Sequence, residues 1–217
     1  MKKYFSFILV FLITVTLQAQ KNKYNLLIGT YTNGCESKGI YVYDFDSNTG
    51  NFNFKNATEN VVNPSYLTVS KDNNFVYSVN ENGAESTVSS FGYNPSTGKL
   101  DLINKQSSKG ADPCYIINDE KNVIVANYSG GNIAVFGKNP NGSITEAKQV
   151  VQHYGKGTNA KRQEGPHVHM VHFSPDKKFI LSNDLGNDKV YSYQYNSNSA
   201  NEILKIKDSI SVKSGSG

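Results

Sequence analysis

Apolar residues occur in this chain as short runs, and the same pattern of runs returns about every fifty residues. Three segments begin at Pro64, Pro113 and Pro166, and each opens with an apolar run such as the one at 113–118. Two further runs follow in every segment, and within them apolar and polar residues alternate. Alternation with a period of two is typical of β-strands that bury one face. The pattern therefore predicts a repeated unit made of short strands.

Polar turn sequences rich in Asn, Asp, Gly and Pro separate these runs. Such residues favour turns because they tolerate left-handed backbone or hydrogen-bond to it with their side chains. In the first two segments, a further turn leads to a fourth run. Four short antiparallel strands in a unit of about fifty residues are typical of one blade of a β-propeller. The turns lie at 71–74, 94–98, 119–122, 139–142 and 175–178.

The sequence therefore predicts an all-β protein, a β-propeller of four-stranded blades with about four blades present. An incomplete copy precedes the three segments and lacks the first strand, so we expect a strand from the other end of the chain to close the ring. The residues before Gly217 contain no obvious closing strand, and we interpret the chain as the N-terminal part of a larger propeller. A complete four-bladed ring is the alternative. The predicted blades cover residues 24–58, 63–107, 112–152 and 165–213.

The first twenty residues have the pattern of a secretory signal peptide. Two lysines precede an apolar run over 4–17, and Ala19 supplies a small residue for cleavage. We expect residues 1–20 to be removed and residues 21–217 to form an exported protein, periplasmic or extracellular, with no stable membrane anchor. An uncleaved anchor is the alternative, although the apolar run is short for a membrane span.

Composition agrees with a turn-rich β-protein and excludes some partners. The chain has 14 Tyr, 11 Phe and 18 Gly but no Trp, and aromatic residues are enriched in strands whereas Gly favours turns. The net charge of +4 comes without a dense run of Lys and Arg, so we expect no nucleic-acid partner. Cys35 and Cys114 are too few for a disulfide framework, and their pairing stays open.

In a propeller blade, the first strand starts and the second strand ends at the same rim of the channel, called the mouth here. Loops at such a rim commonly carry binding residues. Asn recurs at the ends of the second strands, at Asn80, Asn127 and Asn183, but an Asn that stabilises a turn explains this recurrence as well as a substrate contact does. The rim residues that we predict to bind substrate are Tyr31, Asn80, Glu81, Asn127, Tyr128 and Asp184.

Candidate chemistry is concentrated at residues 163–170, which hold two of the four histidines. Strand alternation places His167 and His169 on one face and His172 on the other. Imidazole suits general acid–base catalysis because its pKa lies near neutrality, and the carboxylate of Glu164 lies just upstream. A wholly structural role, with both rings packed between blades, is the alternative.

Two further features near the histidine pair remain open. A metal could use the pair with Glu164, His153 or Asp184 as a third ligand, but this spacing is not diagnostic of a metal site, and we predict none. The loop over 153–164 is longer than its counterparts and contains three basic residues. It could be a basic flap over the mouth or an insertion that the fold tolerates.

Six motifs in order along the chain show a more specific likeness. They lie at 29–32, 38–41, 63–67, 126–131, 165–169 and 184–190. With these motifs the chain resembles the lactonase family of seven-bladed β-propellers, which includes the propeller type of 6-phosphogluconolactonase and is related to the carboxy-muconate lactonising enzyme. The resemblance covers the whole chain after the signal sequence. It implies a ring of seven blades, of which about four are present.

The resemblance implies hydrolysis of a sugar lactone at the mouth, without a metal or an organic cofactor, by a protein that is a monomer at full length. His167 and His169 are then the catalytic candidates, and we add Glu164 as a predicted substrate contact. An Arg and a Glu that complete the family's site would follow Gly217, so we expect the chain alone to be inactive. The export signal departs from the intracellular location of 6-phosphogluconolactone and favours an extracellular sugar lactone or related ester. A non-catalytic exported propeller that binds a carbohydrate or a protein at its rim is the alternative function, since a fold does not fix a function.

Overall fold

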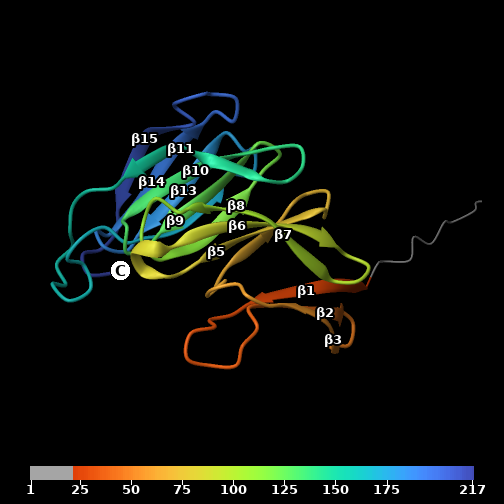
Figure 1. Cartoon of the computed structure of the whole chain (residues 1–217). Helices are drawn as coiled ribbons and strands as arrows, with labels where there is room; N and C mark the ends of the chain where they lie inside the picture. Colours follow the sequence, from red (N-terminus) through yellow and green to blue (C-terminus); the bar gives the residue numbers. More distant parts are fainter. Residues whose placement is uncertain (1–21) are drawn as a thin grey trace, which may run out of the picture.

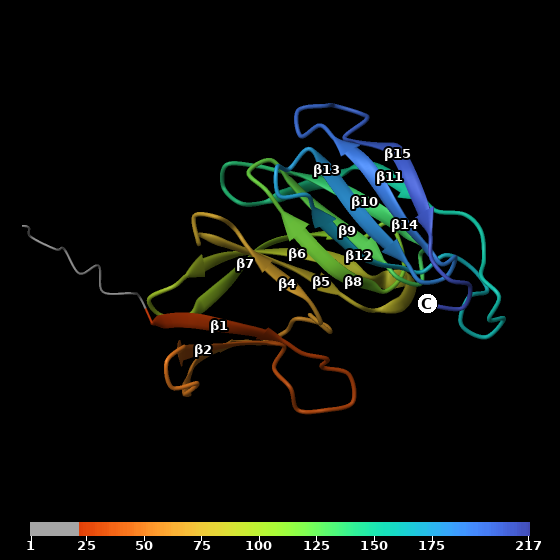
Figure 2. The ribbon, with the colours of Figure 1, turned by 180° about the vertical axis from the view of Figure 1, so that it is seen from behind.

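The computed structural model describes residues 22–217 and shows an all-β protein. Its strands form three sheets of four strands and one sheet of three strands, and Figures 1 and 2 show these sheets side by side as blades of a propeller. The fold class predicted from the repeat is confirmed. The predicted signal peptide, residues 1–20, lies outside the described residues. Within residues 22–217, the structure contains no helix that is long and apolar enough to cross a membrane.

Every sheet is antiparallel, and neighbouring strands follow one another along the chain. The first blade contains β1 (Lys23–Gly29), β2 (Ile40–Asp46) and β3 (Phe52–Thr58). The second contains β4 (Leu67–Val69), β5 (Phe75–Asn80), β6 (Thr87–Asn94) and β7 (Lys99–Ser107), with the short 3-10 helix η1 (Gly83–Glu85) before β6. The third contains β8 (Pro113–Asn118), β9 (Asn122–Asn127), β10 (Asn132–Lys138) and β11 (Ile144–Gln152). The fourth contains β12 (Val168–Phe173), β13 (Phe179–Asp184), β14 (Lys189–Tyr195) and β15 (Leu204–Ser211).

The first strands β4, β8 and β12 form one edge of their sheets and neighbour one another in space, as expected for the strands that line a channel. The fourth strands β7 and β11 are neighbours at the opposite edge, and β3 lies beside β7. The three strands of the first blade therefore correspond to the second, third and fourth strands of the other blades.

The hydrophobic core is divided into three layers, one between each pair of neighbouring blades. In β9, Val123 and Val125 belong to the layer shared with the second blade, whereas Ile124 and Ala126 belong to the layer shared with the fourth. Strand alternation sends successive side chains to opposite faces, so all six residues of β9 are buried. The first and fourth blades also carry exposed apolar side chains, which include Leu26, Ile28, Phe52, Phe54, Leu181, Ile206 and Ile210.

The same backbone hydrogen bond closes successive blades at the mouth. The residue after the fourth strand donates its N–H to the carbonyl of the residue before the third strand. The distances are 3.1 Å from Ser108 to Ser86 and 3.0 Å from His153 to Gly131. His153 therefore occupies in the third blade the place that Ser108 occupies in the second.

The ends of the second strands correct one detail of the match between the internal repeats. The strands β5, β9 and β13 have six residues each and end at Asn80, Asn127 and Asp184. Each of these three residues pairs with the first residue of the next strand. The expected match of Asn183 with the two earlier asparagines is therefore wrong by one position, and an aspartate takes the third place.

Candidate active site at the channel mouth

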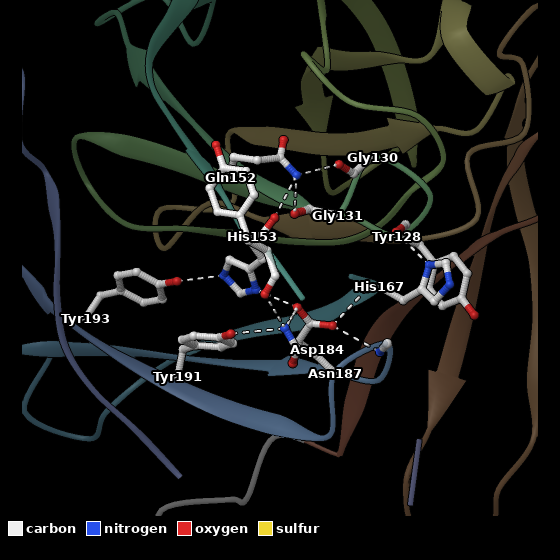
Figure 3. Close-up of polar contacts among 12 residues, drawn as sticks. Tyr128, Gly130, Gly131, Gln152, His153, His167, Asp184, Asn187, Tyr191 and Tyr193 are labelled. Carbon is white, nitrogen blue, oxygen red and sulfur yellow. Dashed lines mark hydrogen bonds and ion pairs between the residues drawn. The ribbon is translucent and has the colours of Figure 1, made fainter. Parts of the chain in front are cut away.

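His167 lies at the mouth, directly before β12, with its imidazole flat against the ring of Tyr128. The ring centroids are 4.4 Å apart and the planes differ by 11°, and Figure 3 shows the two rings stacked. Nδ1 is 3.3 Å from the carbonyl oxygen of Tyr128, and Nε2 is 3.3 Å from Oε1 of Glu164. Both ring nitrogens therefore face acceptor oxygens.

His169 is the extra residue of a β-bulge between Val168 and Met170, where β12 pairs with β13. Its side chain is exposed, and its ring meets Tyr128 edge-on, with 5.7 Å between the centroids and 88° between the planes. Because a bulge re-aims a side chain, regular strand alternation does not describe this segment, yet both predicted histidines reach the same tyrosine. His172 is also exposed, and its Nδ1 is 2.8 Å from the carbonyl oxygen of the next residue.

A second polar group on the rim is built around Glu81, which follows β5. The hydroxyl of Tyr31 donates to Oε2 of Glu81 at 2.8 Å, and the hydroxyl of Ser65 donates to Oε1. Partial burial, followed by the contact with Glu81, raises the pKa of Tyr31 to about 12, so this phenol remains a donor at neutral pH. The structure thus joins two predicted substrate-binding residues. Ser65 joins them as well, although its only sequence signal is its place in one of the six motifs.

Cys114 lies near both polar groups. Its thiol donates to the carbonyl oxygen of His169, with 3.4 Å between sulfur and oxygen. Burial, and then the charge of Glu81, raises the pKa of the Cys114 thiol to about 12, so the thiol is neutral at physiological pH. Cys114 and the exposed Cys35 are both free thiols.

Asn80 and Asn127, both predicted to bind substrate, are buried inside the rim. Asn80 donates from Nδ2 to the carbonyl oxygen of Val62 at 2.9 Å, and Asn127 donates to that of Ser108 at 3.0 Å. Each amide ties the end of a second strand to the loop that leads into the same blade. The structure therefore does not bring these two side chains to the mouth, and their contacts match the turn-stabilising explanation of the recurring Asn.

Asp184 also lies inside the rim, and its side chain is 0% exposed. Oδ1 accepts the backbone N–H groups of His167 at 2.8 Å and Gly186 at 3.0 Å. Oδ2 accepts Nδ1–H of His153 at 2.7 Å and Nδ2–H of Asn187 at 3.0 Å, as Figure 3 shows. Because four donors surround its carboxylate, Asp184 supports His167 from within instead of facing a ligand.

His153 carries no role in the sequence-based site except as a third metal ligand, and the structure gives it a different one. Its side chain is 2% exposed, and Nε2 is 2.6 Å from the hydroxyl of Tyr193. Since the carboxylate of Asp184 can only accept, Nδ1 carries the hydrogen, and in the neutral ring Nε2 accepts from the hydroxyl of Tyr193. Burial raises the pKa of Tyr193, which keeps this phenol a donor. The two partners lie 31 and 40 residues from His153 in sequence, so a local sequence pattern cannot predict these contacts.

The long loop before β12 is held by the buried side chain of Gln163. Its Nε2 donates to the carbonyl oxygen of Leu185 at 2.9 Å and to Oδ1 of Asp188 at 2.8 Å. Its Oε1 accepts the N–H of Asn159 at 3.0 Å. The loop is thus anchored to the rim of the fourth blade, and its three basic side chains are exposed. These are Lys156, Lys161 and Arg162.

Across residues 22–217, no group of three or more His, Cys, Asp and Glu side chains is arranged to hold a metal ion. His153 and Asp184, two of the third ligands considered from the sequence, are bonded to each other inside the rim. Glu164 does reach His167, at 3.3 Å. The structure therefore brings His167, His169, Tyr128 and Glu164 together at the mouth.

Blade-like sheets side by side, with a histidine pair on one rim, define the chain as a β-propeller with a candidate site on that rim. A family model described as "Lactonase, 7-bladed beta-propeller" matches residues 25–217. The chain therefore belongs to the lactonase family of seven-bladed β-propellers, which confirms the resemblance seen in the six motifs.

Several relatives show how much of the family's length this chain represents. The 6-phosphogluconolactonase of Bacillus subtilis is 32% identical over 196 residues, which cover 89% of this chain and 52% of that protein. A crystal structure from Bacteroides fragilis is 39% identical with a TM-score of 0.87, covering 92% of this chain and 57% of the other. The periplasmic gluconolactonase of Pseudomonas aeruginosa is 34% identical with a TM-score of 0.75, covering 84% and 53%. The chain thus spans about half the length of the relatives it matches.

Proposed function

We propose that this protein hydrolyses a sugar lactone at the mouth of its channel, with His167 and His169 as the catalytic histidines. The observation that carries the proposal is the convergence of both imidazoles on Tyr128, beside the carboxylate of Glu164. Membership of the lactonase family supports the same reaction class.

Hydrolysis needs one group that accepts a proton from the attacking water and another that donates a hydrogen bond or a proton to the substrate oxygen on which negative charge develops. Water adds to the lactone carbonyl carbon, the ring C–O bond breaks, and the ring oxygen takes up a proton, so that a hydroxy acid results. His169 is exposed and can accept the proton of the attacking water. His167 is held on Tyr128, and its Nε2 faces the exposed side chain of Glu164. A substrate oxygen that replaces Glu164 there would receive a hydrogen bond as negative charge develops.

Hydrolysis of glucono-δ-lactone and its 6-phosphate, followed by acid release, tests the assignment in a protein extended to the length of its relatives. We expect His169→Ala and His167→Ala each to lower kcat by about 100-fold or more, the usual range for removal of a general acid or base. His172→Ala, on the same strand, is the matched control and should keep wild-type kcat. Wild-type turnover in both His167→Ala and His169→Ala would refute the site.

We further propose that residues beyond Gly217 complete the site and that the present chain alone is inactive. The relatives are about twice as long, and apolar side chains such as Ile28 and Ile206 are exposed on the first and fourth blades, where further blades would cover them. We expect the extended protein to be a monomer that turns over lactone, and residues 22–217 alone to show no turnover. Activity of the short chain would contradict this.

We also propose that the protein is exported and acts on an unphosphorylated sugar lactone. The N-terminal sequence supports export, and the Pseudomonas aeruginosa relative is named as a periplasmic gluconolactonase. We expect kcat/KM for glucono-δ-lactone to exceed that for the 6-phosphate by about tenfold or more. We also expect cell fractionation to recover the protein outside the cytoplasm. A preference for the 6-phosphate, or retention in the cytoplasm, would count against the proposal.

A further inference from the structure

The junction between the third and fourth blades differs from the junction before it at four corresponding positions. Register matches Asn127 with Asp184, and the closing hydrogen bonds match Ser86 with Gly131 and Ser108 with His153. In both blades the residue after the second strand donates its N–H to a carbonyl oxygen at 2.9 Å: Tyr128 to that of Asp112, and Leu185 to that of His167. The fourth match is therefore Asp112 with His167.

At the junction between the second and third blades, neutral side chains make the contacts at the corresponding positions. Asn127 donates to the carbonyl oxygen of Ser108 at 3.0 Å. The N–H of Asp112 donates to the hydroxyl oxygen of Ser86 at 3.3 Å. Two blades of this protein are therefore joined at the mouth by an amide and a hydroxyl, without a buried charge at these positions.

At the later junction, Gly131 offers no hydroxyl, and the N–H of His167 donates instead to Oδ1 of Asp184 at 2.8 Å. A methyl group at Gly131 would lie 2.8 Å from the carbonyl oxygen of Pro166, so glycine allows the segment before His167 to approach closely. His153 then donates to Oδ2 of the same carboxylate at 2.7 Å. Burying a carboxylate carries a desolvation cost that an amide avoids, so joining the blades does not by itself explain Asp184.

We propose that His153 and Asp184 are positioning residues that fix the backbone of His167 so that its imidazole lies on Tyr128. This inference rests on the proposed function, in which His167 acts on the substrate. His167 is anchored at three atoms: its N–H by Asp184 at 2.8 Å, its carbonyl oxygen by the N–H of Leu185 at 2.9 Å, and its Nδ1 by the carbonyl of Tyr128 at 3.3 Å.

The His153–Asp184 pair does not itself reach substrate. In hydrolases that use an Asp–His pair directly, Nε2 of the histidine faces the nucleophile. Here Nε2 of His153 is bonded to the hydroxyl of Tyr193, and both rings are buried. The pair can therefore affect the reaction only through His167.

Three variants of the extended protein test the proposal. Asp184→Asn removes the charge, and His153→Ala removes one donor to the carboxylate. His153→Asn keeps an N–H donor near the position of Nδ1 and loses the contact of Nε2 with Tyr193 and the packing of the ring against Tyr191. We expect kcat to fall about 10- to 100-fold in the first two variants with KM within about threefold of wild type. In His153→Asn, we expect kcat to recover to within about threefold of wild type.

Tyr195→Phe is the matched control for lost stability. Tyr195 lies on β14 two residues after Tyr193, and its hydroxyl donates to Oδ2 of Asp119 at 2.7 Å across the same two blades. Asp119 follows the end of β8, which is the rim opposite the mouth. We expect Tyr195→Phe to lower Tm as the other variants do and to retain wild-type kcat.

Side-chain NMR of His167 gives a readout that needs no turnover. The ring signals, assigned by their loss in His167→Ala, should move in Asp184→Asn and His153→Ala and stay in place in His153→Asn and Tyr195→Phe. If the wild-type protein hydrolyses no lactone, the proposed function fails, and these signals still decide the positioning. Unchanged His167 signals in Asp184→Asn and His153→Ala, with a lowered Tm, would show that the pair only joins the blades and would overturn the inference.

Discussion

Tyr128 holds His167 on two sides: its ring covers the face of the imidazole at 4.4 Å between centroids, and its carbonyl oxygen faces Nδ1 at 3.3 Å. The carbonyl contact depends only on the backbone, whereas the stacking contact depends on an aromatic side chain. The two contributions can therefore be separated by substitution at a single position.

Replacing Tyr128 by Phe preserves an aromatic face under His167, whereas replacing it by Leu removes that face and the edge contact with His169. An aromatic pair of this kind contributes about 0.5–1.5 kcal/mol beyond its buried area, so Tyr128→Leu should orient both imidazoles less well. We expect kcat of Tyr128→Leu to be about tenfold below that of Tyr128→Phe. Steady-state kinetics of the two variants checks this, and equal kcat values would exclude an orienting role for the ring.

Gly186 and Gly165 make a matched pair for testing how tightly the segment before His167 is packed. A methyl group on Gly186 would lie 1.8 Å from the carbonyl oxygen of Gly165 and 2.7 Å from the backbone nitrogen of His167, whereas one on Gly165 would meet nothing within 4 Å. We expect Gly186→Ala to lower the free energy of unfolding by about 2 kcal/mol or more, as overpacking does. Gly165→Ala should change it by about 0.5 kcal/mol or less. Urea denaturation measures both, and similar values would contradict the packing described for Gly186.

The two thiols should differ sharply in reactivity. Burial holds the pKa of Cys114 at about 12, and only the thiolate reacts with an alkylating reagent. Cys35 is exposed. We expect iodoacetamide to label Cys35 in the native protein at about pH 8 and to label Cys114 only after unfolding, as mass spectrometry of the peptides would show. Rapid labelling of native Cys114 would mean that its environment is wetter than described.

Two corresponding turns predict an acid-labile contribution to stability. The hydroxyls of Ser70 and Ser174 donate to Asp72 at 2.6 Å and to Asp176 at 2.7 Å, and these contacts are the largest causes that hold the pKa of each carboxyl below its ordinary value. For a lowered pKa, the contribution is complete above the unfolded value of about 3.9 and is lost as the pH falls through the folded value.

We therefore expect Tm to decrease as the pH is lowered below about 4. In a Ser70→Ala/Ser174→Ala double variant, Tm should fall by a smaller amount over the same pH range, because the carboxyls of Asp72 and Asp176 return towards their ordinary pKa values. Calorimetry from neutral to acid pH provides the comparison. An identical pH dependence in wild type and double variant would show that these turns do not contribute.

The fold was predictable because its signals are local. Alternation within each strand and Asn, Asp and Gly between strands act over a few residues, and their recurrence identified the propeller. The same register placed His167, Tyr128 and Glu81 at one rim, where the structure has them. Their catalytic and binding roles stay predictions.

Other parts of the site depend on contacts that local patterns do not carry. The bulge at His169 interrupts strand alternation. Asp184 lies one residue beyond the asparagine that sequence alignment matched with Asn80, and its bond to His153 spans 31 residues. Asn80 and Asn127 look like ligands in the sequence, but their amides are used to hold loops.

The division of the core into layers between blades has a consequence for synthesis on the ribosome. The layer around Val42 and Phe91 joins the first blade to the second, and the layer around Tyr77 and Phe136 joins the second to the third. A newly made blade therefore has no apolar partner for one of its faces until the next blade has emerged. We expect compact structure to trail translation by one blade throughout this chain, so that the nascent protein always presents one open sheet to chaperones.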